Sequence, residues 1–459
     1  MNETRIAADR ELPSFADVVV LGGGLAGLAA AAYAARGGAS VLLLEKARAP
    51  GGRAATHRID DFCFNIGPHA LYAGCEAEDV LRELAVSFSG RRPPVSGGLA
   101  LRGGCLHTLP SGFVSLLTTG LLSLGGKLEL ARVLASIEKV DPRPLRGRCV
   151  REWIDGTFRD QVVREIVEAL TRVTGYANDP TRADAGAAIA QLQRGLRGVS
   201  YLDSGWQTLV DGLAESAVRA GARIESGQHV RGVHAAPGGA GYSVECDGGR
   251  RVDAGAVVMA VAPAVAAALY HGPASEELRR VAGAVRPVRA ACLDLALRRL
   301  PDPRVLFCLG VDRPLYFSVH SASARLAPSG GGLVHVAKYL PGGDLPAGPE
   351  RHADTDRPDP RADEGELEGF CDLLQPGWRK QVVERRYLPA MTVVHALVEA
   401  GTRRPAAKVE GADGLWLAGD WVGDQGMLLD TALASARVSG CAAAAHASAR
   451  RSDSRPQAA

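Results

Sequence analysis

The sequence lacks the patterns that several classes of protein need. Its nine cysteines form no C-x-x-C pair, so we expect reduced thiols and neither a disulfide framework nor a metal site. Lysine plus arginine (53) and aspartate plus glutamate (51) nearly balance, and no basic stripe is interleaved with aromatic residues, which argues against a nucleic-acid partner. Residues 1–15 carry acids and lack the apolar core of a signal peptide. We therefore expect a cytoplasmic protein.

Long apolar runs and hydrolase motifs are missing as well. The most apolar long window, residues 252–270, is interrupted by Asp253, Gly255 and Pro263, which favours a strand followed by a helix over a membrane span. No G-x-S-x-G or H-E-x-x-H motif is present. With 459 residues, the chain exceeds one hydrophobic core, so two domains are expected.

The strongest positive signal is a strand, a turn and a helix near the N-terminus. The apolar residues 18–21 precede Gly22, Gly24 and Gly27, which have the G-x-G-x-x-G spacing of a dinucleotide-binding turn. The first glycine permits the tight turn, the second lets the backbone approach a diphosphate, and the third lets the helix pack on the strand.

The residues after these glycines extend the same prediction. The diphosphate is expected at the helix N-terminus, beside Leu25 and Ala26, because unpaired N–H groups there favour an anion. A second apolar strand, residues 41–44, ends at Glu45, an acid placed to accept a ribose hydroxyl, with Lys46 beside it. The strands, the helix and the terminal acid together predict a bound dinucleotide.

The next segment favours FAD over NAD. Gly51, Gly52 and Arg53 follow the ribose acid directly, where a nicotinamide enzyme needs no glycine pair and guanidinium. Here the sequence resembles the flavin-dependent amine oxidase and phytoene desaturase superfamily, whose signature is a glycine triplet, a Glu and then GGR. The phytoene desaturase branch is the nearest in pattern.

The resemblance continues at residues 65–72. This segment is similar to the family's D-x-G-P stretch beside the flavin, with Asn65 in place of the usual acid. The resemblance implies that Gly67, Pro68 and His69 lie against the cofactor.

The resemblance returns at residues 414–440. In the family, a strand there ends in Gly-Asp, whose Asp holds the ribityl chain, and the following helix start offers backbone N–H groups to the flavin ring. The matching positions are Gly419, Asp420, Met427 and Leu428.

Two further positions complete the expected cofactor site. Val230 matches the strand whose backbone holds the adenine, and Ala262 lies at the end of a central strand beside the nucleotide. Because nothing resembles the covalent flavin-cysteine segment of monoamine oxidases, we expect non-covalent FAD.

The predicted fold class is α/β: a Rossmann-like FAD-binding domain (GR2-type) with an inserted α+β substrate domain. Its FAD-binding domain is discontinuous, covering residues 14–90, 200–280 and 405–448. The substrate domain is expected to cover residues 91–199 and 281–404, and residues 449–459 are predicted to be a disordered tail.

Candidate catalytic side chains are few, since the cofactor supplies the hard chemistry. His69 is the first, because it lies where the family chain passes the flavin ring, although a packing histidine is an equal alternative. Lys338 is the second, because related amine oxidases hold a water near the flavin with a lysine, but an exposed strand lysine is the commoner case. His320 and His335 are weaker candidates, since strand alternation does not fix where they point.

Two further groups of residues bear on the substrate. The arginines at 143, 146, 148 and 151 could meet an anionic membrane or a phosphorylated substrate, although a solvated basic face is more common. An aromatic cage for an amine is poorly represented, with Trp416, Trp421 and Tyr339 as the candidates.

Residues 112–124 hold no charge and are too short to span a bilayer. They predict a buried helix whose Leu and Phe side chains wall an apolar cavity; a helix that dips into a membrane is the alternative. We therefore expect an apolar small-molecule substrate, with peripheral contact to the inner face of the membrane left open, as is the oligomeric state.

Three functions remain at this point. The first is an FAD-dependent desaturase or dehydrogenase that passes hydride from an apolar substrate to flavin N5. A flavin amine oxidase is the second. The third is a redox-silent isomerase or binding protein, against which the intact cofactor motifs argue.

Overall fold

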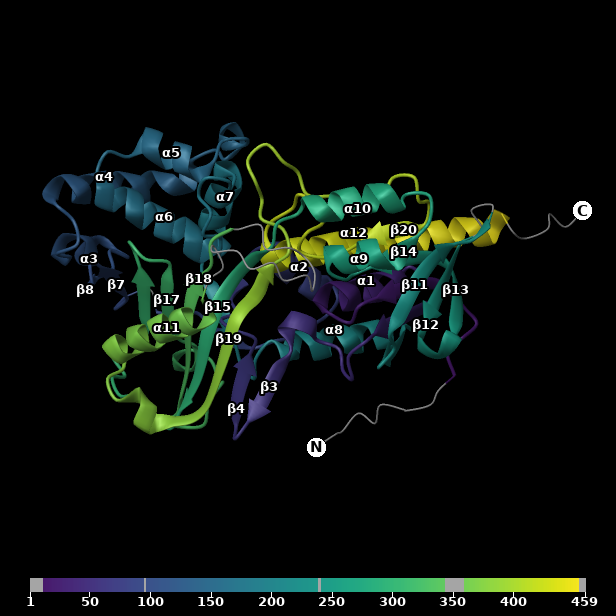
Figure 1. The fold of residues 1–459 in the computed structure, drawn as a ribbon, viewed down its shortest axis with the longest axis horizontal. Helices are drawn as coiled ribbons and strands as arrows, with labels where there is room; N and C mark the ends of the chain where they lie inside the picture. Colours follow the sequence, from purple (N-terminus) through teal and green to yellow (C-terminus); the bar gives the residue numbers. More distant parts are fainter. Residues whose placement is uncertain (1–10, 95, 238–240, 343–358, 454–459) are drawn as a thin grey trace, which may run out of the picture.

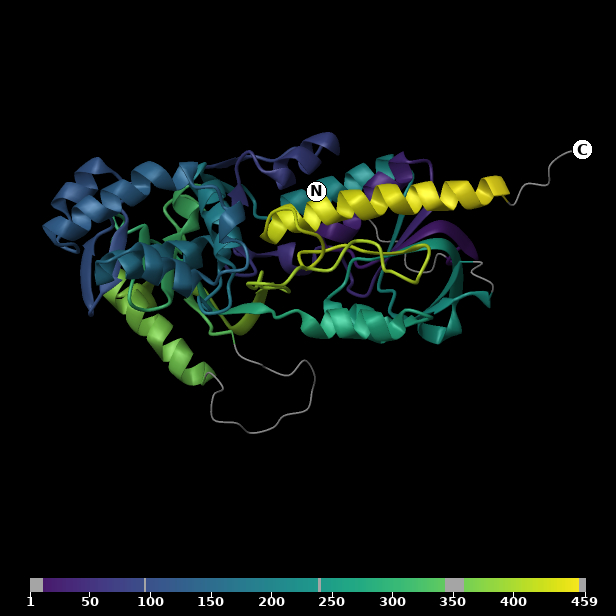
Figure 2. The same ribbon diagram turned by 90° about the horizontal axis from the view of Figure 1, so that it is seen from above.

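The structure is a computed structural model that describes residues 11–94, 96–237, 241–342 and 359–453. Most strands belong to two large sheets, which lie side by side along the long axis of the molecule (Figure 1). Seen from above, the C-terminal helix runs along one of them and a group of short helices covers the far end of the other (Figure 2).

The first sheet carries the glycine-rich turn at the end of its central strand. Its parallel strands pair in the order β10-β2-β1-β13, and β20 pairs with β13 in parallel as well. Strand β12 lies between β11 and β13 and is antiparallel to both. Both faces are covered, so β1 is apolar apart from Asp17 and β2 is apolar apart from its last residue, Glu45. The strands are β1 (Phe15–Leu21), β2 (Val41–Glu45), β10 (Arg223–Ser226), β11 (Val230–Ala235), β12 (Tyr242–Cys246), β13 (Arg251–Met259), β14 (Tyr270–His271) and β20 (Leu415–Leu417).

Helices cover both faces of this sheet. The Ala-rich α1 packs against α12, where a Cβ on Gly440 would overlap the Ala30 carbonyl oxygen, so the two helices approach closely because of that glycine. The helices are α1 (Leu25–Arg36), α2 (Glu76–Glu83), α8 (Gln207–Arg219) and α12 (Leu428–Asp453) on one side and α9 (Pro263–Leu269) and α10 (Ser275–Ala284) on the other.

The second sheet has the order β19-β15-β18-β17-β16-β7-β8 and is antiparallel except between β16 and β7. One face packs on α11, and we call the opposite one the inner face. The elements are β7 (Leu99–Arg102), β8 (Cys105–Thr108), β15 (Val288–Leu297), β16 (Phe307–Gly310), β17 (Leu315–Val319), β18 (Gly332–Tyr339), β19 (Val382–Val394) and α11 (Pro360–Leu374).

Five helices form a lobe at one end of the second sheet. Leu116, Leu121 and Leu122 anchor the first two of them in a core of their own. No helix in the described part of the chain combines the length and the apolar character that crossing a bilayer requires. The helices are α3 (Phe113–Thr118), α4 (Leu124–Ser136), α5 (Val150–Thr157), α6 (Gln161–Gly175) and α7 (Ala185–Leu196).

Two small sheets connect the large ones. They contain β3 (Thr56–Ile59) with β4 (Phe62–Asn65), and β5 (Leu71–Tyr72) and β6 (Gly90–Arg91) with β9 (Val199–Leu202).

The C-terminal tail differs from the prediction within the described residues. Helix α12 continues through Asp453, so residues 449–453 are helical rather than disordered, and residues 454–459 lie outside the described residues. The helix continues past residue 448 because the Ala-rich residues 442–449 favour a helix and because no glycine or proline follows them before Asp453. The other domain boundaries stay predictions.

Candidate active site

The glycine-rich turn is shaped by two positions that cannot carry a side chain. Gly22 has a φ of +101°, and a Cβ there would lie 2.5 Å from the Ala260 carbonyl oxygen. A Cβ on Gly27 would overlap the carbonyl oxygen of Gly22. At Gly24, by contrast, a Cβ would meet no atom of the protein within 4 Å, so the turn leaves open space beside this residue.

The carboxylate of Glu45 closes the turn from the neighbouring strand. Its Oε2 accepts a hydrogen bond from the Gly23 N–H at 2.5 Å, and its Oε1 accepts one from the Ala47 N–H at 2.7 Å. The Gly51 N–H donates to the Gly23 carbonyl at 2.9 Å, which brings the GGR segment beside the turn. Lys46 is exposed.

Arg53 and Asp420, which are 367 residues apart in sequence, form an ion pair of 2.7 Å. Asp420 also accepts a hydrogen bond from His395 Nδ1 at 2.9 Å, and Arg53 donates to the Val393 carbonyl at 2.8 Å. Burial alone would raise the pKa of Asp420, but Arg53 and His395 hold that pKa well below its usual range. We call Gly22–Gly27, Glu45, Gly51–Arg53 and Asp420 the nucleotide cradle.

The turn before α12 adopts a backbone conformation that is rare for its residues. Leu428 has a φ of +56°, in the left-handed region, although it is not a glycine. Arg404 braces this turn, because its guanidinium donates to the Gly426 carbonyl at 2.7 Å and to Thr431 Oγ1 at 2.9 Å. Burial lowers the pKa of Arg404 to about 10. Met427 is almost fully buried beside it.

The remaining predicted cofactor positions lie at the same edge of the first sheet. The Gln228 N–H donates to the Glu45 carbonyl at 2.8 Å. Val230, two residues after Gln228, therefore lies close to the end of β2. Ala262 is the residue before α9 and follows Val261, whose Cγ1 would lie 3.2 Å from a Cβ on Gly22. The structure therefore brings the N-terminal and C-terminal motifs to one edge.

Residues 65–69 cross from the first sheet to the second. Asn65, at the position of the family's acid, is buried and accepts hydrogen bonds from Thr56 Oγ1 at 2.7 Å and from the Trp206 N–H at 3.0 Å. His69 Nδ1 donates to the Gly67 carbonyl at 3.0 Å. Burial lowers the pKa of His69 to about 4, so the ring is neutral at pH 7 and its Nε2 carries a lone pair.

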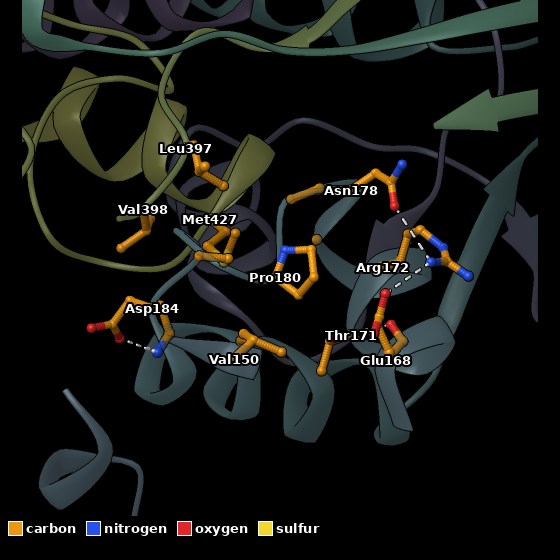
Figure 3. A pocket seen from close by; sticks show the side chains of 15 residues that line it. Val150, Glu168, Thr171, Arg172, Asn178, Pro180, Asp184, Leu397, Val398 and Met427 are labelled. Carbon is orange, nitrogen blue, oxygen red and sulfur yellow. Dashed lines mark hydrogen bonds and ion pairs between the residues drawn. The ribbon is translucent and has the colours of Figure 1, made fainter. Parts of the chain in front are cut away.

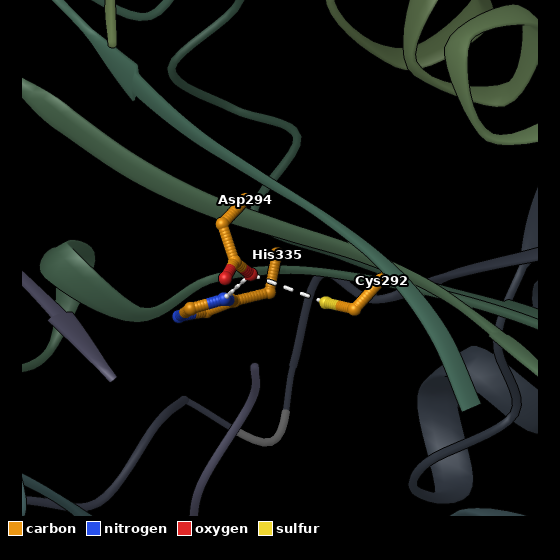
Figure 4. Close-up of side chains that lie close together, drawn as sticks. All are labelled: Cys292, Asp294 and His335. Carbon is orange, nitrogen blue, oxygen red and sulfur yellow. Dashed lines mark hydrogen bonds and ion pairs between the residues drawn. The ribbon is translucent and has the colours of Figure 1, made fainter. Parts of the chain in front are cut away.

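Behind this segment, the inner face holds a buried ionic cluster (Figure 4). Asp294 Oδ1 accepts from His335 Nδ1 at 2.6 Å and from Cys292 Sγ at 3.1 Å, while Oδ2 accepts from Arg386 at 2.6 Å. Burial would raise the pKa of Asp294, but His335 and Arg386 hold it below its ordinary value. Arg386 also donates to the carbonyl of Asn65, so the cluster links the second sheet to residues 65–69, the segment that is expected beside the cofactor.

Cys292, Asp294 and His335 have potential metal-ligand atoms within 4.8 Å of one another. The carboxylate is already neutralised by a guanidinium, so the set fits a paired network better than a cation site.

Aromatic rings surround the cluster. Tyr201 stacks on His320 with ring centroids 3.7 Å apart, and His320 lies edge-on to His335 at 4.5 Å. Burial places the pKa of His320 well below its ordinary value, so this ring is neutral. Tyr176 and Tyr339 meet edge to face at 5.9 Å.

The three aromatic residues named as candidates for an amine cage do not come together, and Lys338 does not face Tyr339. Trp416 and Trp421 pack in the two cores of the first sheet and not with Tyr339. Lys338 points to the α11 face, where its ammonium group pairs with Asp363 at 2.6 Å and Glu366 at 2.7 Å. Because neighbouring residues of a strand point to opposite faces, Lys338 lies away from His69 and Tyr339.

A small pocket lies where the helical lobe meets the turn before α12 (Figure 3). Val150, Leu397 and Met427 contribute apolar walls, and Arg172 with its partner Glu168 lies at one end.

Most of the predicted basic cluster is neutralised. Arg143, Arg146 and Arg151 pair with Asp141, Asp184 and Glu168, respectively. This cluster therefore presents little uncompensated charge.

Comparison with known proteins identifies the family. The profile described as "Flavin containing amine oxidoreductase" matches residues 25–447, almost the whole chain. The chain belongs to this family. It is an FAD-dependent oxidoreductase, which confirms the cofactor and the enzyme class predicted from the motifs.

Two relatives illustrate the range of the family. A carotenoid 3,4-desaturase of Haloarcula japonica is 54% identical over 52 residues, 11% of this chain and 10% of the relative. A protein of Mycobacterium tuberculosis named as a flavin-containing monoamine oxidase is 28% identical over 281 residues, 57% of this chain and 60% of the relative. The chain thus spans about a tenth and three-fifths of these two proteins.

Solved structures agree on the fold. An oxidoreductase from Methanosarcina mazei matches with a TM-score of 0.72 and 19% identity over 92% of this chain and 99% of that one. Cyclohexylamine oxidase from Brevibacterium oxydans matches with a TM-score of 0.69 and 15% identity over 95% of this chain and 100% of that one. The predicted fold class, a Rossmann-like FAD-binding domain with a substrate domain, is confirmed.

The nucleotide cradle fits the cofactor of the family. The space beside Gly24 is open, no side chain caps the N-terminus of α1 at this residue, and Glu45 is held beside the turn by the Gly23 N–H. The individual FAD contacts named from the sequence stay predictions. His395, Arg404, Asp294 and Arg386 were missed; the one available signal was an acid within the apolar run of β15.

Proposed function

We propose that this chain is a desaturase or dehydrogenase that oxidises an apolar small molecule, with FAD as the hydride acceptor. The observation that carries the proposal is an apolar cluster on the inner face against Gly67. A Cβ on Gly67 would lie 2.5 Å from Met391 and 3.7 Å from Cys292 Sγ, so this cluster, which we call the wall, packs against residues 65–69. The members of the cluster are Cys292, Tyr316, Ala337 and Tyr339, with Val173, Tyr176, Phe307, Leu388 and Met391 partly buried around them.

The electrostatics of this wall favour a neutral substrate. Its carboxylate, Asp294, is engaged by Arg386 and His335 and is fully buried. A charged amine placed there would lose hydration without gaining a carboxylate partner, which is unfavourable.

The chain's own residues have distinct roles in this proposal. The turn at Gly24 holds the diphosphate, Glu45 the ribose, and Asp420 the ribityl chain. FAD supplies the group that accepts hydride. His69 presents a lone pair at Nε2 and can accept a hydrogen bond or a proton there, but as a neutral ring with Nδ1 bound to Gly67 it does not act as an acid.

An amine oxidase is the second candidate. The edge-to-face pair of Tyr176 and Tyr339 supports it, because aromatic faces can hold an amine. The match to a protein named as a monoamine oxidase supports it too.

The two candidates are separated by anaerobic titration of the FAD-loaded protein. Conjugated polyenes, monoterpenes and primary amines are each added, and loss of the oxidised flavin absorbance is followed. We expect an apolar hydrocarbon to reduce the flavin and primary amines to leave it oxidised. Rapid reduction by an amine, with none by any hydrocarbon, would replace the proposal with the amine oxidase.

A pair of variants tests the wall itself. Met391→Glu places a charge beside Gly67, whereas Leu373→Glu places the same charge on an exposed position of α11. We expect the first to slow flavin reduction by hydrocarbons at least about tenfold, since a factor of ten corresponds to about 1.4 kcal/mol, and the second to leave the rate unchanged.

A further inference from the structure

The helices α3 and α4 form a tip of the molecule that exposes large apolar side chains. Phe113 is 76% exposed, Leu117 55% and Leu124 83%, and Val114 and Leu128 are exposed as well. We call these five residues the apolar tip. Helix α3 lies at the far end of the helical lobe, away from the C-terminal end of α12 (Figures 1 and 2). The sequence predicted that residues 112–124 wall a cavity, and the structure contradicts that expectation for the four tip residues within this range, Phe113, Val114, Leu117 and Leu124.

The tip is exposed because of how its two helices are anchored. α3 has six residues, and α3 and α4 are held through Leu116, Leu121 and Leu122, which pack into the helical core. The opposite sides of both helices have no partner in the described chain. An exposed apolar group of this size marks an interaction surface.

A groove with unpaired cations lies beside the tip. It has a volume of about 740 Å³, and its apolar floor includes Trp153 and Phe158, whose rings meet edge to face at 5.3 Å. Arg132 and Arg159 line it, and the guanidinium group of neither one pairs with a carboxylate in the described part of the chain. Most arginines nearby do, as in the Arg102–Glu165 pair at 2.7 Å.

The two acids of this groove are already engaged. Glu129 accepts hydrogen bonds from the Arg159 N–H at 2.7 Å and the Asp160 N–H at 2.9 Å. Asp160 Oδ1 accepts from the first N–H groups of α6 at 2.9 and 3.1 Å. Both carboxylates therefore serve the backbone, and the guanidinium groups remain available to an anion.

We propose that the apolar tip inserts into a bilayer of anionic phospholipid while Arg132 and Arg159 hold headgroup phosphates. This inference goes beyond the flavin reaction and does not depend on its substrate. Protruding side chains on two short helices suit a deformable apolar surface, and α3 is only about 9 Å long, so it lies in the interface and does not span it. A second copy is a poor occupant, because a symmetric contact would bring the same unpaired arginines together.

The test is flotation of the full-length FAD-loaded protein with vesicles. Vesicles of phosphatidylcholine alone are compared with vesicles containing about one-third phosphatidylglycerol. We expect binding to the anionic vesicles that is several-fold stronger and that weakens with salt. Absence of binding to the anionic vesicles overturns the proposal.

Matched variants test which residues make the contact. Leu117→Asp with Leu124→Asp should weaken binding at least about tenfold, whereas Val218→Asp, at a position 56% exposed on α8, should not. Equal losses in both proteins, or none in either, contradict the assignment. Flavin absorbance and melting temperature confirm that each variant is folded.

Arg132→Gln with Arg159→Gln should remove the preference for anionic vesicles, whereas Arg143→Gln, whose guanidinium pairs with Asp141, should keep it. If the preference persists without Arg132 and Arg159, the headgroup assignment is wrong. Light scattering provides a further check: a dimer that the Leu117 and Leu124 substitutions dissociate would identify the tip as a contact between copies and overturn the bilayer proposal.

Discussion

The nucleotide cradle and the inner face of the second sheet are built by different kinds of interaction. In the cradle, Gly22, Gly27 and backbone N–H groups set the shape, and most of the residues lie within 32 positions, from Gly22 to Arg53. On the inner face, an ionic cluster of side chains does so, and Arg386 reaches the carbonyl of a residue 321 positions away. The cradle is thus sensitive to added volume and the inner face to changed charge.

The largest expected effect comes from volume in the cradle. Gly27→Ala would overlap the Gly22 carbonyl, so we expect the turn to be displaced, FAD to be lost and the melting temperature to fall. Gly24→Ala is the matched control, because its Cβ meets no protein atom; it should change the free energy of unfolding by less than about 1 kcal/mol while still lowering FAD affinity. Thermal melts and flavin fluorescence measure both. A Gly27→Ala protein with full flavin occupancy would show that the cradle is not limited by volume.

The next effect comes from the same charge change made in each region. Asp294→Asn should lower the free energy of unfolding by about 2–3 kcal/mol, because the charged hydrogen bonds of the fully buried carboxylate to His335 and to Arg386, whose side chain is 24% exposed, are weakened. Asp420→Asn should instead act mainly on FAD affinity, since Arg53 is partly exposed and can be solvated. The pKa of each carboxyl is held below its ordinary value, so the stability that it adds is present at neutral pH and is lost as the pH falls below about 4. Denaturant titrations and flavin titrations separate the two. If both variants lose stability and flavin in equal measure, the regions do not differ as described.

This comparison explains what the sequence could predict. A tight turn against a diphosphate requires glycine at fixed spacing and an acid at the next strand end, so Gly22, Gly27 and Glu45 could be recognised locally. The Asp294–Arg386 pair depends on which strands become neighbours, which no local pattern specifies.

Strand alternation had a narrower limit. Alternation correctly predicts that the odd and even positions of β18 point to opposite faces of the sheet. It does not predict which of the two faces lies toward the cofactor. Lys338 was therefore a candidate until its pairing with α11 placed it on the other face, and His335 was undervalued for the same reason.

His69 joins the two regions and should give a pH-dependent effect. Its pKa in the folded protein is about 4, below the ordinary 6.5, so the folded state binds fewer protons between these values. The stability due to the neutral ring is present above pH 6.5 and declines as the pH falls toward 4, by at most about 3 kcal/mol. His69→Gln should flatten the stability profile in that window, and denaturant midpoints measured at several pH values test it. An unchanged profile would mean that His69 stays solvated.

The smallest effect on chemistry is expected at Lys338. Its ammonium group pairs with Asp363 and Glu366 on the face that packs on α11, so it contributes to the attachment of that helix and not to the cofactor side. Lys338→Gln should lower the free energy of unfolding by about 1–2 kcal/mol, since glutamine can still donate one hydrogen bond to the carboxylate. The rate of flavin reduction should stay within about twofold, a barrier change below about 0.5 kcal/mol. The matched change Tyr339→Phe, one residue along on the inner face, should alter that rate more than stability if the wall meets the substrate. A large rate loss in Lys338→Gln with little change in stability would return the lysine to the active site and place the boundary between the two faces elsewhere.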